Sequence, residues 1–389
     1  MSARGTPPVH DRVLLTLACA GVAAIAFGGF VNHAANRLAD GVALPLWRAP
    51  PGDQALIAGA LVAMALASCL VREKTRAAVA IGSAFALFFG CLITAAHFAD
   101  RLAEGAKPAA RTSLGAAFWT LVALALLCAL NAAQRGRLPF ALRVAVGAGF
   151  AAGFAALAQA GVFAQLAIAR EFAVHRAEFM AQLWRHAALV GASVAIALAV
   201  SIPLTALALR QAHWRGLLFS TLGVVQTIPS IALFGVLIAP LAALAARFPL
   251  LGAWGVGGTG AAPAIIALTL YSLGPLVRIF VTGFNEVSAD VKDAARGIGF
   301  DRRRLFFAVE FPLALPALIS GLRVVAIQAI GLAAVAALIG AGGLGVFVFQ
   351  GIGQYALDLV LLGAIPIILM ALAADLVFSA ALSAARGKR

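Results

Sequence analysis

Charged residues are scarce in this chain, and their scarcity excludes a water-soluble protein. Of its 389 residues, 11% are charged and 63% are hydrophobic, whereas soluble domains carry about 25% charged residues. A single core could not hide that much apolar surface from water. Apolar runs of roughly 20 residues, the length a helix needs to cross a bilayer, recur along the whole sequence. The composition therefore predicts an all-α membrane protein.

Sequence patterns typical of disulfides, metal sites and nucleotide sites are missing as well. The four cysteines form no CxxC pair, the six histidines show no metal-ligand spacing, and no G-x-x-x-x-G-K-[ST] occurs. Two stretches, 255–260 and 340–345, fit G-x-G-x-x-G. Neither belongs to a βαβ unit, so we interpret both as loop turns. These patterns predict a protein with no catalytic residues, no metal and no cofactor of its own.

Ten apolar segments are long enough to be transmembrane helices, and a more polar segment, 170–185, divides them into two groups of five. The first five are about 14–31, 54–71, 77–96, 115–132 and 140–163, and the second five are about 186–209, 217–244, 263–284, 318–340 and 357–382.

The charges of the connecting loops predict how these segments are oriented. With the amino terminus in the cytoplasm, the cytoplasmic loops hold seventeen Lys and Arg residues and the opposite loops hold nine. Cytoplasmic loops of membrane proteins are enriched in Lys and Arg. The net charge of +14 is therefore explained by membrane topology, without a nucleic-acid partner. We expect a multi-pass membrane protein with both termini in the cytoplasm.

The longest polar interruption, 285–304, is predicted to form two short helices on the cytoplasmic side. Ser288 or Asp290 can cap the first helix, because their side-chain oxygens accept hydrogen bonds from its free amide groups. Gly299 can adopt a positive φ and turn the chain. Asp301 can cap a second short helix, and Pro312 marks the return into the membrane.

This loop resembles the EAA loop of binding-protein-dependent ABC importer permeases. The resemblance rests on Asp293, Ala294, Ala295, Gly299 and Pro312, with Asp in place of the family's usual Glu. It implies that the segment 285–312 is a coupling loop that docks on a separate ATPase subunit, with the two alanines giving a low-relief face. ATP and Mg²⁺ would then be used by that partner.

Further segments resemble the glycine betaine/carnitine/choline branch of these permeases. They are 226–233 (QTIPSIAL), 271–275 (YSLGP), 294–299 (AARGIG) and 339–345 (IGAGGLG). The resemblance implies a type I permease core of five helices, 186–385, after an amino-terminal transmembrane extension, 1–169, and a polar connector, 170–185. It also implies a second permease subunit, an extracytoplasmic solute-binding protein and a compatible solute such as glycine betaine or choline.

Polar residues inside two spans are candidates for the translocation path. Gln226, Thr227 and Ser230 surround Pro229, which interrupts the seventh span, and Gln328 lies in the ninth. Lipid cannot satisfy such groups, so they face protein or a water-filled path. Pore lining and helix-to-helix hydrogen bonding are equally compatible with the sequence, as they are for Arg323. Asp375 in the last span is expected to be a structural partner of a basic group.

Two other functions remain as alternatives. An amino acid permease would share the coupling loop. A secondary transporter would be expected to place ionisable groups within its spans or to show two related halves, and this sequence shows few such carboxylates and dissimilar halves. An enzyme would need convergent acids, histidines or a metal cluster, which the sequence does not suggest.

Overall fold

A computed structural model describes residues 11–36, 39–69, 73–253 and 255–387, and it divides into two compact units, Met1–Val174 and His175–Arg389. Five of the basic residues used to predict orientation lie outside the described residues, namely Arg4, Arg37, Arg72, Lys388 and Arg389. Within those residues, nine helices are long and apolar enough to cross a membrane, and the helix Arg12–Phe27 is apolar but shorter.

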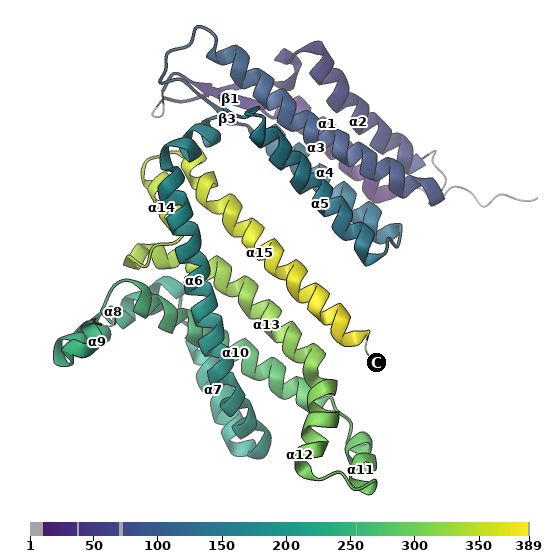
Figure 1. The fold of residues 1–389 in the computed structure, drawn as a ribbon. Coiled ribbons are helices and arrows are strands. Elements are labelled where there is room, and N and C mark those ends of the chain that lie inside the picture. Colours follow the sequence, from purple (N-terminus) through teal and green to yellow (C-terminus); the bar gives the residue numbers. More distant parts are fainter. Residues whose placement is uncertain (1–10, 37–38, 70–72, 254, 388–389) are drawn as a thin grey trace, which may run out of the picture. The chain divides into compact units, whose positions relative to one another are not determined.

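The first unit is a helical bundle with a small sheet at one end (Figure 1). Its helices are α1 (Arg12–Phe27), α2 (Pro51–Cys69), α3 (Glu73–Ala103), α4 (Ala116–Arg135) and α5 (Phe140–Gln159), and its strands are β1 (Val31–Ala34), β2 (Val42–Leu44) and β3 (Arg111–Leu114). The bundle core includes the fully buried side chains of Phe30, Met64, Leu87 and Leu121. All five helices were expected from hydropathy, and the sheet was not.

The sheet joins the loops that follow α1 and α3. Its strand order is β2-β1-β3, and both pairings are antiparallel, with Val31 opposite Leu44 on one side and Leu114 on the other. Nδ1 of His33 lies 3.1 Å from Oγ1 of Thr112 across one pairing. Strands of three or four residues fall below the length at which alternation becomes a useful sequence signal.

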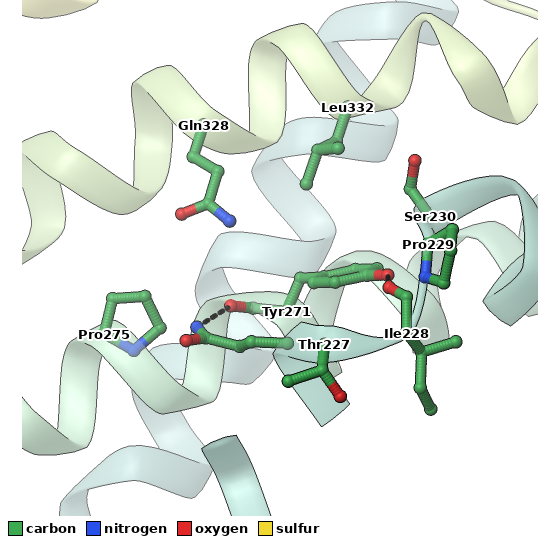
Figure 2. Close-up of a pocket in the computed structure, with 9 residues that line it drawn as sticks. Thr227, Ile228, Pro229, Ser230, Tyr271, Pro275, Gln328 and Leu332 are labelled. Carbon is green, nitrogen blue, oxygen red and sulfur yellow. Dashed lines mark hydrogen bonds between the residues drawn. The ribbon is translucent and has the colours of Figure 1, made fainter. Parts of the chain in front are cut away.

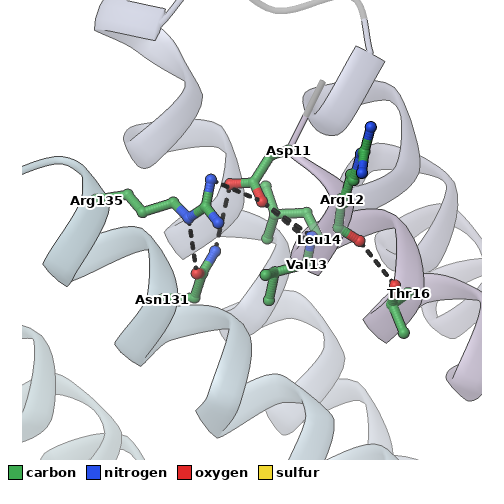
Figure 3. Close-up of polar contacts among 7 residues, drawn as sticks. All are labelled: Asp11, Arg12, Val13, Leu14, Thr16, Asn131 and Arg135. Atoms are coloured by element: carbon green, nitrogen blue, oxygen red, sulfur yellow. Dashed lines mark hydrogen bonds and ion pairs between the residues drawn. The ribbon is translucent and has the colours of Figure 1, made fainter. Parts of the chain in front are cut away.

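A buried carboxylate holds the opposite end of the bundle together (Figure 3). Asp11 is 3% exposed, and its Oδ1 accepts hydrogen bonds from the amides of Val13 and Leu14, which caps α1. Arg135, in the last turn of α4, lies 3.4 Å from the same oxygen, and Asn131 donates to Oδ2 at 3.4 Å. The carboxylate therefore links the start of α1 to the end of α4.

The second unit contains the second group of predicted spans. Its longer elements are α6 (Ala167–Arg210, which begins in the first unit), α7 (Ala212–Thr227), α8 (Ser230–Arg247), α10 (Ala261–Asn285), α13 (Phe311–Ala333) and α15 (Leu357–Arg386). Its shorter helices are α9 (Pro249–Ala253), α11 (Ala289–Gly297), α12 (Arg302–Leu305) and α14 (Gly345–Gly353). A π-helical turn, Phe306–Glu310, and a 3₁₀ turn, Val335–Ile339, precede and follow α13.

Two predicted segments have a structure that hydropathy did not specify. The polar segment 170–185 is helical and forms the first part of α6, with non-helical dihedral angles at His175, where the two units meet in sequence. The predicted span 217–244 is divided into α7 and α8 at Ile228 and Pro229. Proline supplies no amide hydrogen and restricts the residue before it to extended geometry, and Ile228 has φ −70° and ψ 127°.

Helices α10 and α13 pack against each other at the centre of the second unit. They can approach closely because glycine lies at their crossing. A Cβ atom added to Gly283 would come within 2.5 Å of the Cβ atom of Ala317, and one added to Gly321 would come within 3.2 Å of Ile279. Leu268 and Leu276 of α10 are fully buried in the resulting core. This rigid pair carries both hollows described below.

Candidate functional site

The coupling segment, residues 285–312, has the two-helix geometry expected from its sequence. The Ser288 hydroxyl accepts a hydrogen bond from the Val291 amide at 3.4 Å and caps α11. The Asp301 carboxylate accepts one from the Arg304 amide at 2.8 Å and caps α12. Of the two candidates for the first cap, Ser288 is the residue at the N-cap position, and Asp290 lies in the first turn.

The turn between these two helices depends on Gly299. Its φ is +90°, a region that side chains on L-residues strongly disfavour. The Gly299 amide donates to the carbonyl of Arg296 at 2.9 Å, and the Phe300 amide donates to the carbonyl of Ala295 at 3.1 Å. This pair of bonds is the Schellman arrangement that ends helices at a left-handed residue, as the position of Gly299 in the sequence predicts.

The coupling segment is fastened to the neighbouring spans by an ion pair and ring contacts. Nζ of Lys292 in α11 lies 3.6 Å from a carboxylate oxygen of Glu310 in the π-helical turn. The ring of Phe306 stacks on that of Phe284, at the end of α10, with 5.8 Å between ring centroids. A displacement of α11 would therefore reach α10 and α13 through packed groups.

The two alanines of the loop face different surroundings. Ala295 is 7% exposed and packs inward, whereas Ala294 is exposed. The two alanines therefore do not form a shared docking face in the structure. The most exposed large apolar groups of the segment are Ile298, 75% exposed, and Phe307, 62% exposed. Sequence reasoning did not single out these two residues, although large apolar side chains in a polar loop are a signal of an interface.

The same short segment carries exposed charges. Asp293 forms an ion pair with Arg296 one helical turn later, with 2.7 Å between Oδ1 and Nη1. The guanidinium of Arg304 lies over the ring of Phe300 at 4.5 Å from its centroid. Apolar groups with a charged rim are characteristic of surfaces that bind another protein.

A polar hollow, which we call the middle hollow, forms where α7 and α8 meet α10 and α13 (Figure 2). Its volume is about 490 Å³. The five residues proposed from sequence as a path, Gln226, Thr227, Pro229, Ser230 and Gln328, all line it, together with Ile228, Tyr271, Pro275 and Leu332. The structure thus brings Gln328 of α13 to the break between α7 and α8.

Hydrogen bonds within the middle hollow stabilise the interrupted helix. The Tyr271 hydroxyl donates to the carbonyl of Ile228, which the break leaves outside the helical ladder. The Gln226 side-chain amide donates to the carbonyl of Tyr271 at 3.3 Å. Figure 2 shows the Gln328 amide pointing into the hollow from the opposite wall. Both roles considered from sequence, helix-to-helix bonding and hollow lining, therefore occur in this one group of residues.

Tyr271 is the residue of this site that sequence reasoning passed over. The sequence places it within the stretch YSLGP, which suggests no role for the residue by itself. The signal was available, because the chain has two tyrosines and one lies inside an apolar span. A tyrosine in such a place usually needs a hydrogen-bond partner for its hydroxyl.

The ionisable pair of the last spans is joined as expected. Oδ1 of Asp375 in α15 lies 2.6 Å from Nη2 and 2.7 Å from Nε of Arg323 in α13. The prediction that Asp375 pairs with a basic group is confirmed, and the partner is identified. An arginine and a carboxylate within spans are tolerated in this way because each neutralises the other.

The glycine-rich stretch 340–345 is a turn held by α6. Gly340, Gly342 and Gly343 have positive φ. Nε of Arg185 donates to the carbonyl of Ala341 at 2.6 Å, and the amide of Gly343 donates to Oε1 of Gln182 at 2.7 Å. The interpretation as a loop turn is confirmed, and the stretch 255–260, with positive φ at Gly255 and Gly260, is also a turn.

Comparison with known proteins identifies the family. Residues 201–384 match the family described as binding-protein-dependent transport system inner membrane component. The osmoprotectant import permease protein OsmW of Salmonella typhimurium is 36% identical over 205 residues, which cover 52% of this chain and 90% of that protein. The chain belongs to this family of permeases. It is therefore the permease subunit of an ABC importer, a multi-pass inner-membrane protein that works with a separate ATPase and a solute-binding protein.

Other relatives and a second match extend this result. Residues 11–169 of the permease match the ABC transporter permease YehY, N-terminal domain. The choline transport system permease protein OpuBB of Bacillus subtilis is 31% identical over 204 residues, which cover 52% of this chain and 87% of that protein. A solved structure of the MetNI methionine ABC transporter, in an inward-facing conformation, has a TM-score of 0.43 at 21% identity and covers 52% of this chain and 95% of that chain.

Proposed function

We propose that this permease imports a small quaternary ammonium compound or related compatible solute, such as glycine betaine, carnitine or choline. The similar proteins whose names state a substrate are osmoprotectant, choline and carnitine permeases. The observation that carries the proposal within this chain is the middle hollow, whose lining combines polar and apolar side chains and carries no charged one. Such a lining can pass a solute of this class without binding it tightly.

The path through the permease includes Gln226, Thr227, Pro229, Ser230 and Gln328. These residues come from two elements, the α7–α8 break and α13, and they converge on one hollow. Within an apolar span, a polar hollow of this size is the best candidate for a water-filled step of transport. A rocking of α13 against the α7–α8 break would open and close it.

The coupling segment is the place where the ATPase acts. Asp293, Ala294, Ala295, Gly299 and Pro312 belong to a capped, fastened pair of short helices with exposed apolar residues at its tip. ATP-driven closure of two ATPase subunits would push this segment, and the contacts from Lys292 to Glu310 and from Phe306 to Phe284 would carry the push into the spans.

The assembly includes a second permease subunit, identical or related, which we infer from the family to which the chain belongs. We place both termini and the coupling segment on the cytoplasmic side, in line with the distribution of Lys and Arg. Residues 1–169 form the amino-terminal extension, 170–185 connect it, and 186–385 form the permease core.

Radiolabelled uptake by the reconstituted complex tests this function. The permease, its ATPase and its binding protein are placed in proteoliposomes, with ATP on the ATPase side. We expect uptake of glycine betaine, carnitine or choline and no uptake of a panel of amino acids that includes methionine. Uptake of an amino acid in preference to these three solutes would instead identify an amino acid permease.

A further inference from the structure

A second hollow, which we call the inner hollow, lies at the other end of the α10–α13 pair. Its volume is about 410 Å³, and α15 contributes one residue to its wall. Unlike the middle hollow, it is lined by charged side chains, Arg278, Glu286 and Arg386, and by the hydroxyl-bearing residues Thr282 and Ser320. None of these five residues belongs to the coupling segment's capped helices or to the middle hollow.

The two hollows lie along one face of the α10–α13 pair. On α10, Tyr271 and Pro275 line the middle hollow, and Arg278, Thr282 and the C-cap residue Glu286 line the inner one. Successive members of this set are three or four residues apart, which places them on one side of a helix. From Tyr271 to Glu286 this stripe runs about 22 Å along the helix axis, so it can lead a solute from one hollow toward the other.

Helix α13 also contributes residues to both hollows. Gln328 and Leu332 line the middle hollow, and Ser320 and Pro316 line the inner hollow. From Pro316 onward these positions advance by four, eight and four residues, which is about 40°, 80° and 40° around the helix. The two pairs therefore lie on adjacent sides of α13, and α10 supplies the continuous wall between the two hollows.

The charges of the inner hollow favour a ligand that bears a carboxylate. Its lining has two guanidinium groups and one carboxylate, so it is positive by one charge. Arg278 donates one N–H to the carbonyl of Phe219 at 3.1 Å, and its guanidinium lies 5.3 Å from the centroid of the Phe219 ring. That contact orients the group and uses one of its five N–H donors. The remaining donors suit the two oxygens of a carboxylate.

We propose that the inner hollow is a second solute station, in which Arg278 binds the carboxylate of a zwitterionic solute and Glu286 faces its cationic end. The proposal rests on the function proposed above and narrows it to zwitterions such as glycine betaine and carnitine. Choline has the same cationic head without a carboxylate. It would meet a wall of net positive charge and has no carboxylate for Arg278 to bind, so the station discriminates against it.

Uptake by variants of the reconstituted complex tests the role of Arg278. Arg278→Gln removes the charge, Arg278→Lys keeps it, and Arg210→Gln changes an exposed arginine at the end of α6, outside the hollow. The uptake rate of each variant is divided by the wild-type rate for the same solute. This ratio removes the solute preference of the binding protein, which is the same in all complexes. Losing one charge-assisted hydrogen bond should lower glycine betaine uptake by about tenfold for Arg278→Gln. Arg278→Lys should retain most uptake, and Arg210→Gln should match wild type.

A protection experiment tests occupancy without transport. Ser320→Cys places a thiol in the inner hollow, and Ser383→Cys places one on α15 outside it. Peptide mass spectrometry measures thiol modification at each position, so the native cysteines can remain. We expect glycine betaine to slow modification at position 320, choline to have little effect there, and neither to affect position 383.

The outcomes separate this proposal from the proposed function. A wild-type complex that imports no betaine and no choline would overturn the function. The station is overturned if wild type imports glycine betaine while Arg278→Gln matches it. It is equally overturned if choline protects position 320 as well as glycine betaine does, or if neither solute protects it.

Discussion

Gly299 is the residue on which the shape of the coupling segment depends. Its φ of +90° permits the two bonds that end α11, and no atom lies within 4 Å of where its Cβ would be. A substitution is therefore opposed by backbone conformation and not by a clash. Asparagine tolerates this conformation far better than a β-branched residue does.

The first prediction compares two variants of this residue. Gly299→Val should misplace α12 at a cost of roughly 1–2 kcal/mol and should strongly reduce the amount of ATPase that co-purifies with the membrane-inserted permease. Gly299→Asn should retain most of it. Equal recovery of ATPase with both variants would contradict the role assigned to this turn.

A second prediction concerns the pair of Arg323 and Asp375, whose side chains are each about one third exposed in the single chain. Arg323→Gln and Asp375→Asn should each lower the thermal stability of the detergent-solubilised protein, by roughly 1–2 kcal/mol. The double variant should be no less stable than the worse single variant, because it leaves no unpaired charge. Losses that simply add would show that the two residues act independently.

At the scale of elements, the break between α7 and α8 creates the middle hollow. The hydroxyl of Tyr271 in α10 donates a hydrogen bond to the Ile228 carbonyl, which has no partner within the interrupted helix. The chain provides a matched control, because its other tyrosine, Tyr355, is 92% exposed in the turn before α15. The same hydroxyl can thus be removed at both positions.

Tyr271→Phe should lower solute uptake severalfold, because a buried carbonyl without its donor costs about 1–3 kcal/mol and the break can then change shape. Tyr355→Phe should leave uptake unchanged. Uptake by the reconstituted complex measures both effects. If the Tyr271→Phe complex transports at the wild-type rate, the hydroxyl does not support the break.

The crossing of α10 and α13 yields a prediction about packing. Gly283→Ala would bring its new methyl group within 2.5 Å of Ala317, whereas no atom lies within 4 Å of a Cβ atom at Gly331 in α13. Gly283→Ala should therefore destabilise the permease by roughly 1–3 kcal/mol, and Gly331→Ala should be neutral or stabilising. Thermal unfolding in detergent compares them, and equal melting temperatures would rule out a tight crossing.

Local signals in the sequence predicted the two short helices of the coupling segment and the turn between them. Ser288, Gly299 and Asp301 act within three or four residues of themselves, so their roles as caps and turn could be read from their spacing. The inward position of Ala295 could not, because it depends on how α11 packs against the rest of the segment. The short strands β1 to β3 were missed because their pairing joins residues far apart in the chain.

The same distinction explains what was found and missed in the site. Gln226, Thr227, Pro229, Ser230 and Gln328 were selected because polar residues and a proline are conspicuous within apolar spans. The sequence does not single out Arg278 or Glu286. Arg278 is an isolated charge in its span, and Glu286 is one of several charged residues in a polar loop. Their presence in one hollow becomes visible only in the structure, where both lie on the stripe of α10 and face residues of α13 and α15.

At the scale of the whole molecule, the permease combines two compact units with different roles. The first is tied together at one end by the buried Asp11 and at the other by a sheet. The second carries both hollows and the coupling segment. The central claim is that a separate ATPase moves the second unit through that segment, on the cytoplasmic side of the membrane.

Site-specific photocross-linking tests this claim most directly. A photoreactive residue replaces either Ile298, at the exposed tip of the coupling segment, or Tyr355, which is even more exposed but lies at the opposite ends of the spans. The complex is then illuminated in membrane vesicles. The account predicts a cross-link from position 298 to the ATPase and none from position 355. Cross-linking of the ATPase from position 355, or none from position 298 in an active complex, would contradict it.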